Sequence, residues 1–60
     1  MHDTIILKTG RTIPFYSSLG FHGIYVEVDN SLFDTAEDKK NFESEIKQER
    51  DVVRITYIKK

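Results

Sequence analysis

The sequence predicts a small α+β domain with the element order βββαβ. Three observations support this fold class: apolar residues flank a Lys-Thr-Gly-Arg turn signal near the N-terminus, two later segments alternate between apolar and polar residues, and a charged segment with helical spacing separates those two. We expect one four-stranded, mostly antiparallel mixed sheet with the helix packed on one face. A chain of 60 residues is short, so residues 1–60 are predicted to form a single domain with a thin core.

The first predicted element is a β-hairpin over Asp3–Tyr16. A three-residue loop at residues 8–10, with its glycine in the left-handed region, places Ile5 opposite Ile13 and avoids a like-charge pair at the turn. In this register the same face also carries Leu7 and Phe15. Because Pro14 has no N–H, we expect it at a bulge or near the end of its strand, where a donor would be unpaired.

A turn with two glycines precedes the third strand. Gly20 and Gly23 bracket Phe21 and His22, and we interpret both glycines as residues that give the chain a positive φ. The third strand, Ile24–Val28, then alternates between two faces. Its apolar face carries Ile24, Val26 and Val28, and its other face carries Tyr25 and Glu27.

A helix is predicted at Thr35–Glu49. Asp34 lies three residues before Glu37, which resembles a capping box and makes Asp34 the predicted N-cap. Phe42 and Ile46 lie one turn apart and form a narrow apolar stripe. The same side extends toward Ala36 and Leu32. Because the stripe is narrow, packing on the sheet must stabilise this helix.

The last strand is predicted at Val52–Ile58. One of its faces carries Val53, Ile55 and Tyr57, and the other carries Val52, Arg54, Thr56 and Ile58. The run Ile5-Ile6-Leu7 is apolar on both faces, as expected of an interior strand. We therefore expect the last strand to lie beside the first, in the sheet order 4-1-2-3.

The composition provides no obvious cross-link. There is no Cys, and His2 and His22 lack the clustered partners that a metal site needs, so we expect neither cofactor nor metal. Self-association is the remaining common source of stability for so short a chain. The net charge of −1 combines an acidic segment at residues 27–51 with a basic tip at residues 52–60. This balance does not favour nucleic acid or a membrane as partner.

Six residues are candidates for contact with another protein. Phe21 and His22 are expected at the tip of the glycine turn, where a Phe is poor core material but a good anchor. The sheet face that the helix leaves uncovered is expected to carry the other four, which are Ile6, Tyr25, Arg54 and Ile58. Tyr, Ile and Arg are residue types that anchor protein interfaces. The alternative is an ordinary half-exposed sheet, on which scattered apolar residues are common.

Catalysis is not predicted. Ser17, Ser18, His22 and Glu27 include the residue types of a catalytic triad, but they crowd around one turn instead of converging from separate elements. The leading hypothesis is a non-enzymatic protein-interaction module, a small homodimeric inhibitor or regulator of a larger protein. Free-standing domains of this size also suggest a phage or other mobile-element origin, with a host protein as target. The strand pattern begins directly after Met1, so we expect a cytoplasmic protein.

The alternative hypothesis is a nucleic-acid-binding regulator that uses the uncovered sheet face. In that reading Tyr25 stacks on bases, while Arg54, Lys8 and the C-terminal pair Lys59-Lys60 contact phosphates. Glu27 on the same face and the lack of net positive charge oppose this hypothesis. A protein contact therefore remains the preferred prediction.

Overall fold

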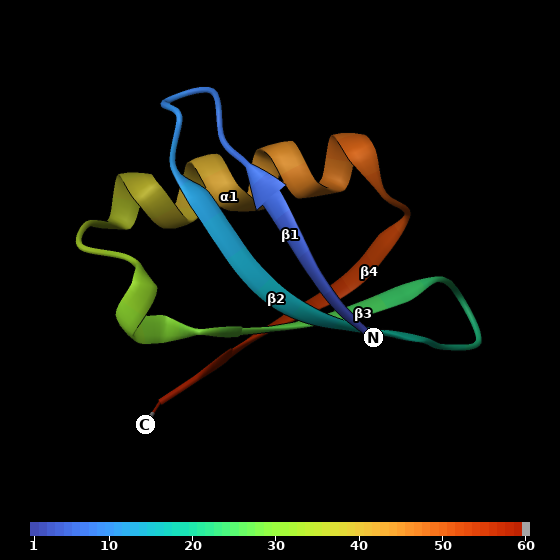
Figure 1. Ribbon diagram of the computed structural model, residues 1–60. Helices are drawn as coiled ribbons and strands as arrows, with labels where there is room; N and C mark the ends of the chain where they lie inside the picture. Colours follow the sequence, from blue (N-terminus) through green and yellow to red (C-terminus); the bar gives the residue numbers. More distant parts are fainter. Residues whose placement is uncertain (60) are drawn as a thin grey trace.

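The computed structural model describes residues 1–59 and contains a four-stranded sheet with an α-helix across one face (Figure 1). The elements, in chain order, are β1 (His2–Ile6), β2 (Thr12–Leu19), β3 (Ile24–Asp29), the 3-10 turn η1 (Asn30–Leu32), α1 (Ala36–Glu49) and β4 (Val52–Ile58). β2 pairs antiparallel with both β1 and β3, whereas β3 and β4 pair parallel. The predicted α+β class, the mixed sheet and the order βββαβ are confirmed.

The order of the strands across the sheet is β1-β2-β3-β4, so the predicted order 4-1-2-3 is wrong. The chain leaves β3, passes through α1 and returns beside β3, which keeps consecutive strands adjacent. The prediction relied on apolar residues on both sides of β1. However, Ile6 is 69% exposed on the face of the sheet that α1 does not cover, which we call the open face. A single apolar side chain on an exposed face is therefore compatible with an edge strand.

The β1–β2 hairpin has the predicted register, with Ile5 opposite Ile13. The N–H of Leu7 donates to the carbonyl of Arg11 at 2.8 Å, which closes the predicted three-residue loop. Gly10 ends this loop with a φ of 94°, in the region that favours glycine. The turn chemistry of this segment therefore fixes which side chains of the hairpin face the core.

Pro14 lies at a position where β2 needs no N–H. Its register partner in β1 is Thr4, and this pair falls between hydrogen-bonded pairs, so Pro14 is not required to donate to β1. On the other side, the pairing of β2 with β3 begins only at Tyr16. The expectation for Pro14 is confirmed, because it lies before the first β2–β3 pair, where no N–H is needed for a hydrogen bond.

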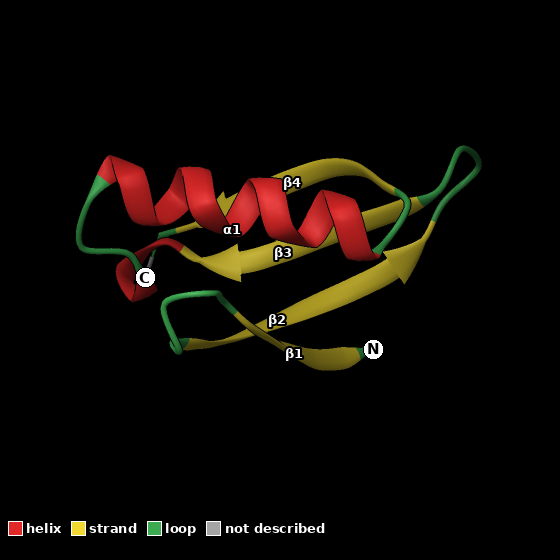
Figure 2. Ribbon diagram, turned by 90° about the horizontal axis from the view of Figure 1, so that it is seen from above, coloured by secondary structure: helices red, strands yellow, loops and turns green. Residues whose placement is uncertain are grey.

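The core lies between α1 and the sheet (Figure 2). Within residues 1–59 its buried side chains are Ile5, Leu7, Ile13, Phe15, Val26, Val28, Phe33, Phe42 and Ile46. The predicted helix stripe supplies the last two, both fully buried. The ring centroid of Phe42 lies 5.3 Å from that of Phe33 and 6.3 Å from that of Phe15. Phe42 thus connects the helix, the segment before it and β2.

A β-bulge changes what β4 contributes to the core. The register of β3 with β4 shifts by one residue just after Ile24, because Val53 is an extra residue in β4. Val52 therefore packs against the core, and Val53 is 46% exposed. The predicted faces are wrong for these two valines and correct for Ile55 and Tyr57, which pack against the core. A strict alternation cannot reveal a bulge.

The N-cap of α1 is Thr35, one residue later than predicted. The Thr35 hydroxyl accepts from the N–H of Asp38 at 3.2 Å, and the helix begins at Ala36. The prediction of Asp34 as the cap is wrong because two overlapping pairs have the cap spacing, Asp34 with Glu37 and Thr35 with Asp38. The sequence pattern alone does not choose between them.

Two arginines hold the β1–β2 hairpin against α1. Arg11 Nη1 lies 3.0 Å from Asp38 Oδ2 in the first turn of the helix, and its Nη2 donates to the carbonyl of Leu32. Arg50, the C-cap residue, donates through Nη2 to Asp3 Oδ2 at 2.8 Å. The hairpin is therefore tied to both ends of the helix. As both pairs are partly exposed, each contributes modestly to stability.

Candidate functional site

A backbone hydrogen bond and close side-chain packing hold the loop between β2 and β3, which we call the braced loop. The N–H of Gly20 donates to the carbonyl of Gly23 at 2.7 Å and closes the turn. Gly23 has a φ of 145°, as predicted. Gly20 has no positive φ, so that part of the prediction is wrong. The missing side chain of Gly20 makes room for the ring of Tyr25, which would have to shift for a Cβ because that atom would come within 2.1 Å of Tyr25 Cε2.

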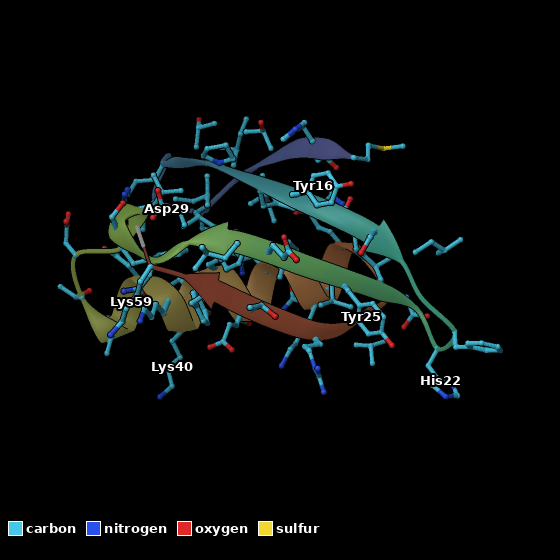
Figure 3. All side chains as sticks on the ribbon, turned by 90° about the horizontal axis from the view of Figure 1, so that it is seen from below. Tyr16, His22, Tyr25, Asp29, Lys40 and Lys59 are labelled. Carbon is cyan, nitrogen blue, oxygen red and sulfur yellow. The ribbon has the colours of Figure 1, made fainter. Side chains whose placement is uncertain are left out.

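This braced loop presents large apolar side chains to solvent. Phe21 is 100% exposed and Leu19, at the end of β2, is 87% exposed. Figure 1 shows the loop extending beyond the end of α1, and Figure 3 places His22 at its tip. The predictions that Phe21 and His22 lie at a loop tip are therefore correct as statements of position. Exposed aromatic side chains on a fixed turn are good anchors for a partner.

Sequence reasoning missed Leu19 and Met1. The main chain of Met1 pairs with Ser17, and Met1 lines a hollow of about 280 Å³ together with Leu19 and Ile24. Leu19 shares the strand face of the core residue Phe15, which would have placed it in the core, but at 87% exposed it is not covered. This exposure depends on how far α1 extends along β2, which the pattern of a single strand does not specify. We refer to three exposed apolar residues at this end of the sheet, Met1 and Leu19 beside the hollow and Phe21 in the loop, as the loop patch.

The open face carries a second, more polar surface (Figure 3). At its centre Tyr16 pairs with Glu27, and the ring centroids of Tyr16 and His2 lie 5.2 Å apart, edge to face. A shallow depression of about 470 Å³ lies here, lined by Pro14, Tyr16, Glu27, Ile58 and neighbouring residues. Its walls combine apolar and acidic groups, so this face has no uniform chemical character.

The structure brings only some of the predicted contact residues together. Tyr25 and Arg54 are register partners at the loop end of the open face, close to the turn that holds Phe21 and His22. Ile6 and Ile58 lie at the opposite end of the sheet and on opposite edge strands. Tyr25 is half-buried over Gly20, which gives it a role in the fold. The six residues therefore do not form one surface.

The basic residues of the nucleic-acid hypothesis are also dispersed. Lys8 lies in the β1–β2 turn and Arg54 near the start of β4, at opposite ends and opposite edges of the sheet. Lys59 follows the far end of β4, and Lys60 lies outside the described residues. Glu27 occupies the centre of the open face between them. This arrangement offers no continuous basic track for a phosphate backbone.

The serine, histidine and glutamate side chains that resemble a triad lie in separate places. The hydroxyl of Ser17 donates to the carbonyl of Met1 at 3.4 Å, on the helix side of the sheet. Ser18 and Glu27 lie on the open face, and His22 lies at the loop tip. The acidic stretch after β3 has a structural role, because Asp29 accepts from the N–H and the hydroxyl of Ser31.

Asp3 and Tyr57 have shifted pKa values. The N–H of Thr4 is the main cause that holds the pKa of Asp3 below its ordinary value of 3.8; burial opposes it, and the hydrogen bond and charge of the Arg50 guanidinium lower the pKa further. On β4, burial and then the negative charge of Glu43 raise the pKa of Tyr57 from 10.0 to about 12. The Tyr57 hydroxyl oxygen is buried and has no hydrogen-bond partner of normal geometry within residues 1–59.

The Tyr57 shift predicts a loss of stability in alkali. The unfolded chain releases this proton near pH 10.0 and the folded chain near pH 12, so the free energy of unfolding should fall as pH rises between these values. We expect Tyr57→Phe to remove this part of the fall, because the group whose pKa differs between the folded and unfolded chain is lost. Ultraviolet titration of tyrosinate checks this prediction. Tyr25→Phe, the control, should retain the late titration step, and its disappearance there would contradict the assignment.

Within residues 1–59, no helix combines the length and apolar character needed to cross a membrane. The same part of the chain has no group of three or more His, Cys, Asp or Glu side chains placed to hold a metal ion. Comparison of this chain with protein-family models, with curated proteins and with solved structures gives no match.

Proposed function

We propose that this chain is a non-enzymatic protein-interaction module that binds a larger protein through the loop patch. The observation that carries the proposal is the complete exposure of Phe21 on a turn that the hydrogen bond from Gly20 to Gly23 closes. A fully exposed Phe contributes no packing to the fold, so its apolar surface is unfavourable until a partner covers it. An inhibitor or regulator of the partner is the role that fits a domain of this kind.

The bracing of the loop supports this proposal. The hydrogen bond between Gly20 and Gly23 and the ring of Tyr25 fix one side of the turn. On the other side, Gly23 lies against the Asp51 carbonyl and the Val53 side chain at the start of β4. A loop already held in one conformation loses little conformational entropy on binding, and this favours affinity. The partner is expected to provide an apolar pocket deep enough for one phenylalanine ring.

The proposal includes self-association and a cytoplasmic target in a host cell. The thin core supports self-association, since a chain of 60 residues without Cys has few other ways to gain stability. The small size supports an origin in a phage or other mobile element. The open-face alternative, binding of nucleic acid, is not proposed, because its basic residues lie far apart on the sheet.

The first test is the variant Phe21→Ser. We expect its free energy of unfolding to stay within about 0.5 kcal/mol of wild type, because Phe21 touches no core residue. Its capture of the partner from the native cell should fall by about 30-fold or more, as for an interface anchor worth about 2 kcal/mol. Quantitative affinity capture and urea unfolding make the two measurements.

A matched variant separates contact from general surface effects. Lys40→Ser changes an exposed residue of α1, remote from the loop, and should leave both capture and stability unchanged. Equal capture by Phe21→Ser and wild type would contradict the proposal. Loss of cooperative unfolding in Phe21→Ser would also contradict it, because it would assign Phe21 to the fold.

A further inference from the structure

The sheet has two edge strands, β1 and β4, and their outward main-chain groups differ. Along β1, residues that hydrogen-bond to β2 alternate with residues that do not. The hydrogen bonds from the Leu7 N–H to the Arg11 carbonyl and from the Ser17 N–H to the Met1 carbonyl show that the odd-numbered residues pair with β2. Consequently His2, Thr4, Ile6 and Lys8 direct their N–H and carbonyl groups away from the sheet. A second strand can pair with β1 only through these outward groups.

Carboxylates occupy two of the four outward donors along residues 2–8, one in β1 and one in the turn that follows it. The N–H of Thr4 donates to Asp3 Oδ1 at 2.8 Å. The N–H of Lys8 donates to both carboxylate oxygens of Glu45, at 2.9 and 3.2 Å. An incoming strand would have to displace both carboxylates and leave their negative charge beside its own carbonyl oxygens. The β1 edge is therefore protected against strand pairing.

The β4 edge has no such protection. The bond from the Ile24 N–H to the Asp51 carbonyl and the register of Val26 with Ile55 direct Arg54, Thr56 and Ile58 toward β3. The N–H and carbonyl groups of Ile55 and Tyr57 therefore point outward. In the part of the chain that the structure describes, no hydrogen bond reaches these four groups. The bulge at Val53 lies before them, so residues 54–58 form a regular, open edge.

We propose that β4 pairs antiparallel with β4 of a second copy of this chain, about a two-fold axis at Thr56. This inference rests on the proposed function and names the surface through which the module dimerises. With the axis at Thr56, Ile55 exchanges two hydrogen bonds with Tyr57 of the second copy, and the symmetric pair does the same. This is the register that uses the whole regular segment and leaves the bulge outside.

The side chains of β4 are self-complementary in this register. On the open face the two Thr56 side chains meet on the axis, and Arg54 lies opposite Ile58 of the second copy, so no like charges face each other. On the helix side, the half-buried Ile55 lies opposite Tyr57 of the second copy, which extends the core across the junction. Ile58, now 41% exposed, is covered by the arginine stem.

Symmetry also limits the size of this assembly. Pairing of β4 with β4 is isologous and closes after two copies. The edges that remain are the two β1 strands, which Asp3 and Glu45 protect. Pairing of β4 with β1 of another copy would be heterologous and would propagate into a filament, and the same carboxylates oppose it. The structure therefore favours a dimer with a continuous eight-stranded sheet.

Single cysteines test the register, because the described chain contains no cysteine. Thr56→Cys places two thiols in a close, non-hydrogen-bonded pair on the axis, so mild oxidation should convert it to a covalent dimer. Arg54→Cys is the matched control on the same strand and face. Its thiol lies opposite Ile58 of the second copy, so it should stay uncross-linked alone and cross-link when mixed with Ile58→Cys. The unmodified chain should reach twice its 7.0 kDa mass at high micromolar concentration.

Three results would overturn this inference. The first is the mass of a monomer at every concentration. The second is oxidation of Thr4→Cys, on β1, to a covalent dimer as fast as that of Thr56→Cys. The third is a Thr56→Cys variant that forms a disulfide only with a different protein in lysate. The last would assign the edge to a strand of the partner. Phe21 is not on β4, so retained partner capture by a monomeric chain would reject the dimer while keeping the proposed contact of Phe21 with a partner protein.

Discussion

Phe42→Ala is expected to leave most of the chain unfolded at room temperature. Phe42 is 0% exposed and its ring contacts those of Phe15 and Phe33, so truncation opens a cavity among three elements. Such a change costs about 3–5 kcal/mol. A single core in a chain of this length rarely supplies more than about 3–5 kcal/mol of stability, so this one cavity removes most or all of it. Urea unfolding followed by circular dichroism measures the effect.

Ile46→Val is the matched control for this prediction. Ile46 is also fully buried on the same stripe of α1, but the change removes a single methylene and should cost about 1 kcal/mol. This variant should therefore unfold cooperatively, at a lower urea concentration than wild type. A Phe42→Ala variant that unfolds cooperatively and within 1 kcal/mol of wild type would show that the core is not organised around Phe42.

Gly23→Ala is expected to cost about 3 kcal/mol. The residue has a φ of 145°, and a Cβ would lie 2.7 Å from both the Asp51 carbonyl oxygen and Val53 Cγ2. This carbonyl belongs to Asp51, directly before β4, and accepts from the N–H of Ile24 at 2.8 Å, so it cannot move without breaking that hydrogen bond. Backbone strain and the close contact therefore act together. Thermal unfolding measures the loss.

Gly10→Ala separates these two contributions. Gly10 also has a positive φ, of 94°, but a Cβ there would meet no atom within 4 Å. We expect a cost of about 1–2 kcal/mol, which is the backbone strain alone. An equal loss of stability in the two variants would contradict this account, because it would show that the close contact of Gly23 with the start of β4 adds nothing to the cost of the substitution.

Local chemistry made the first hairpin predictable. Gly10 and the like-charge pair that a shorter loop would create leave one register for Ile5 and Ile13, and this register fixes which residues face the core. The helix stripe was clear at Phe42 and Ile46, which repeat with the helical period, but its predicted extension to Ala36 is wrong because Ala36 is exposed. In both cases the deciding interaction lies within a few residues along the chain.

The errors concern choices that depend on distant residues. The position of β4 depends on which strand the helix can reach, and the pattern in β1 does not encode this. The bulge at Val53 and the closeness of Tyr25 to Gly20 arise where two strands meet, so neither appears in the alternation of a single strand. The N-cap differs for another reason, because Asp34 and Thr35 both satisfy the pattern.

The candidate site was predictable only in part. The paired glycines marked the turn that exposes Phe21 and His22, since such a turn leaves little room for burial. Leu19 was not predictable, because its strand parity matches the core residue Phe15. Its exposure depends on where α1 ends above the sheet. The protection of the β1 edge by Glu45 likewise joins residues far apart in sequence.

Site-specific cross-linking tests the central claim, that Phe21 contacts a partner protein, most directly. A photoreactive phenylalanine analogue replaces Phe21 in one sample and Lys40, on the exposed side of α1, in the control. Irradiation in the native cell is predicted to join the chain to one larger protein from position 21 and not from position 40. Adducts that form equally from both positions, or only from position 40, would contradict the account.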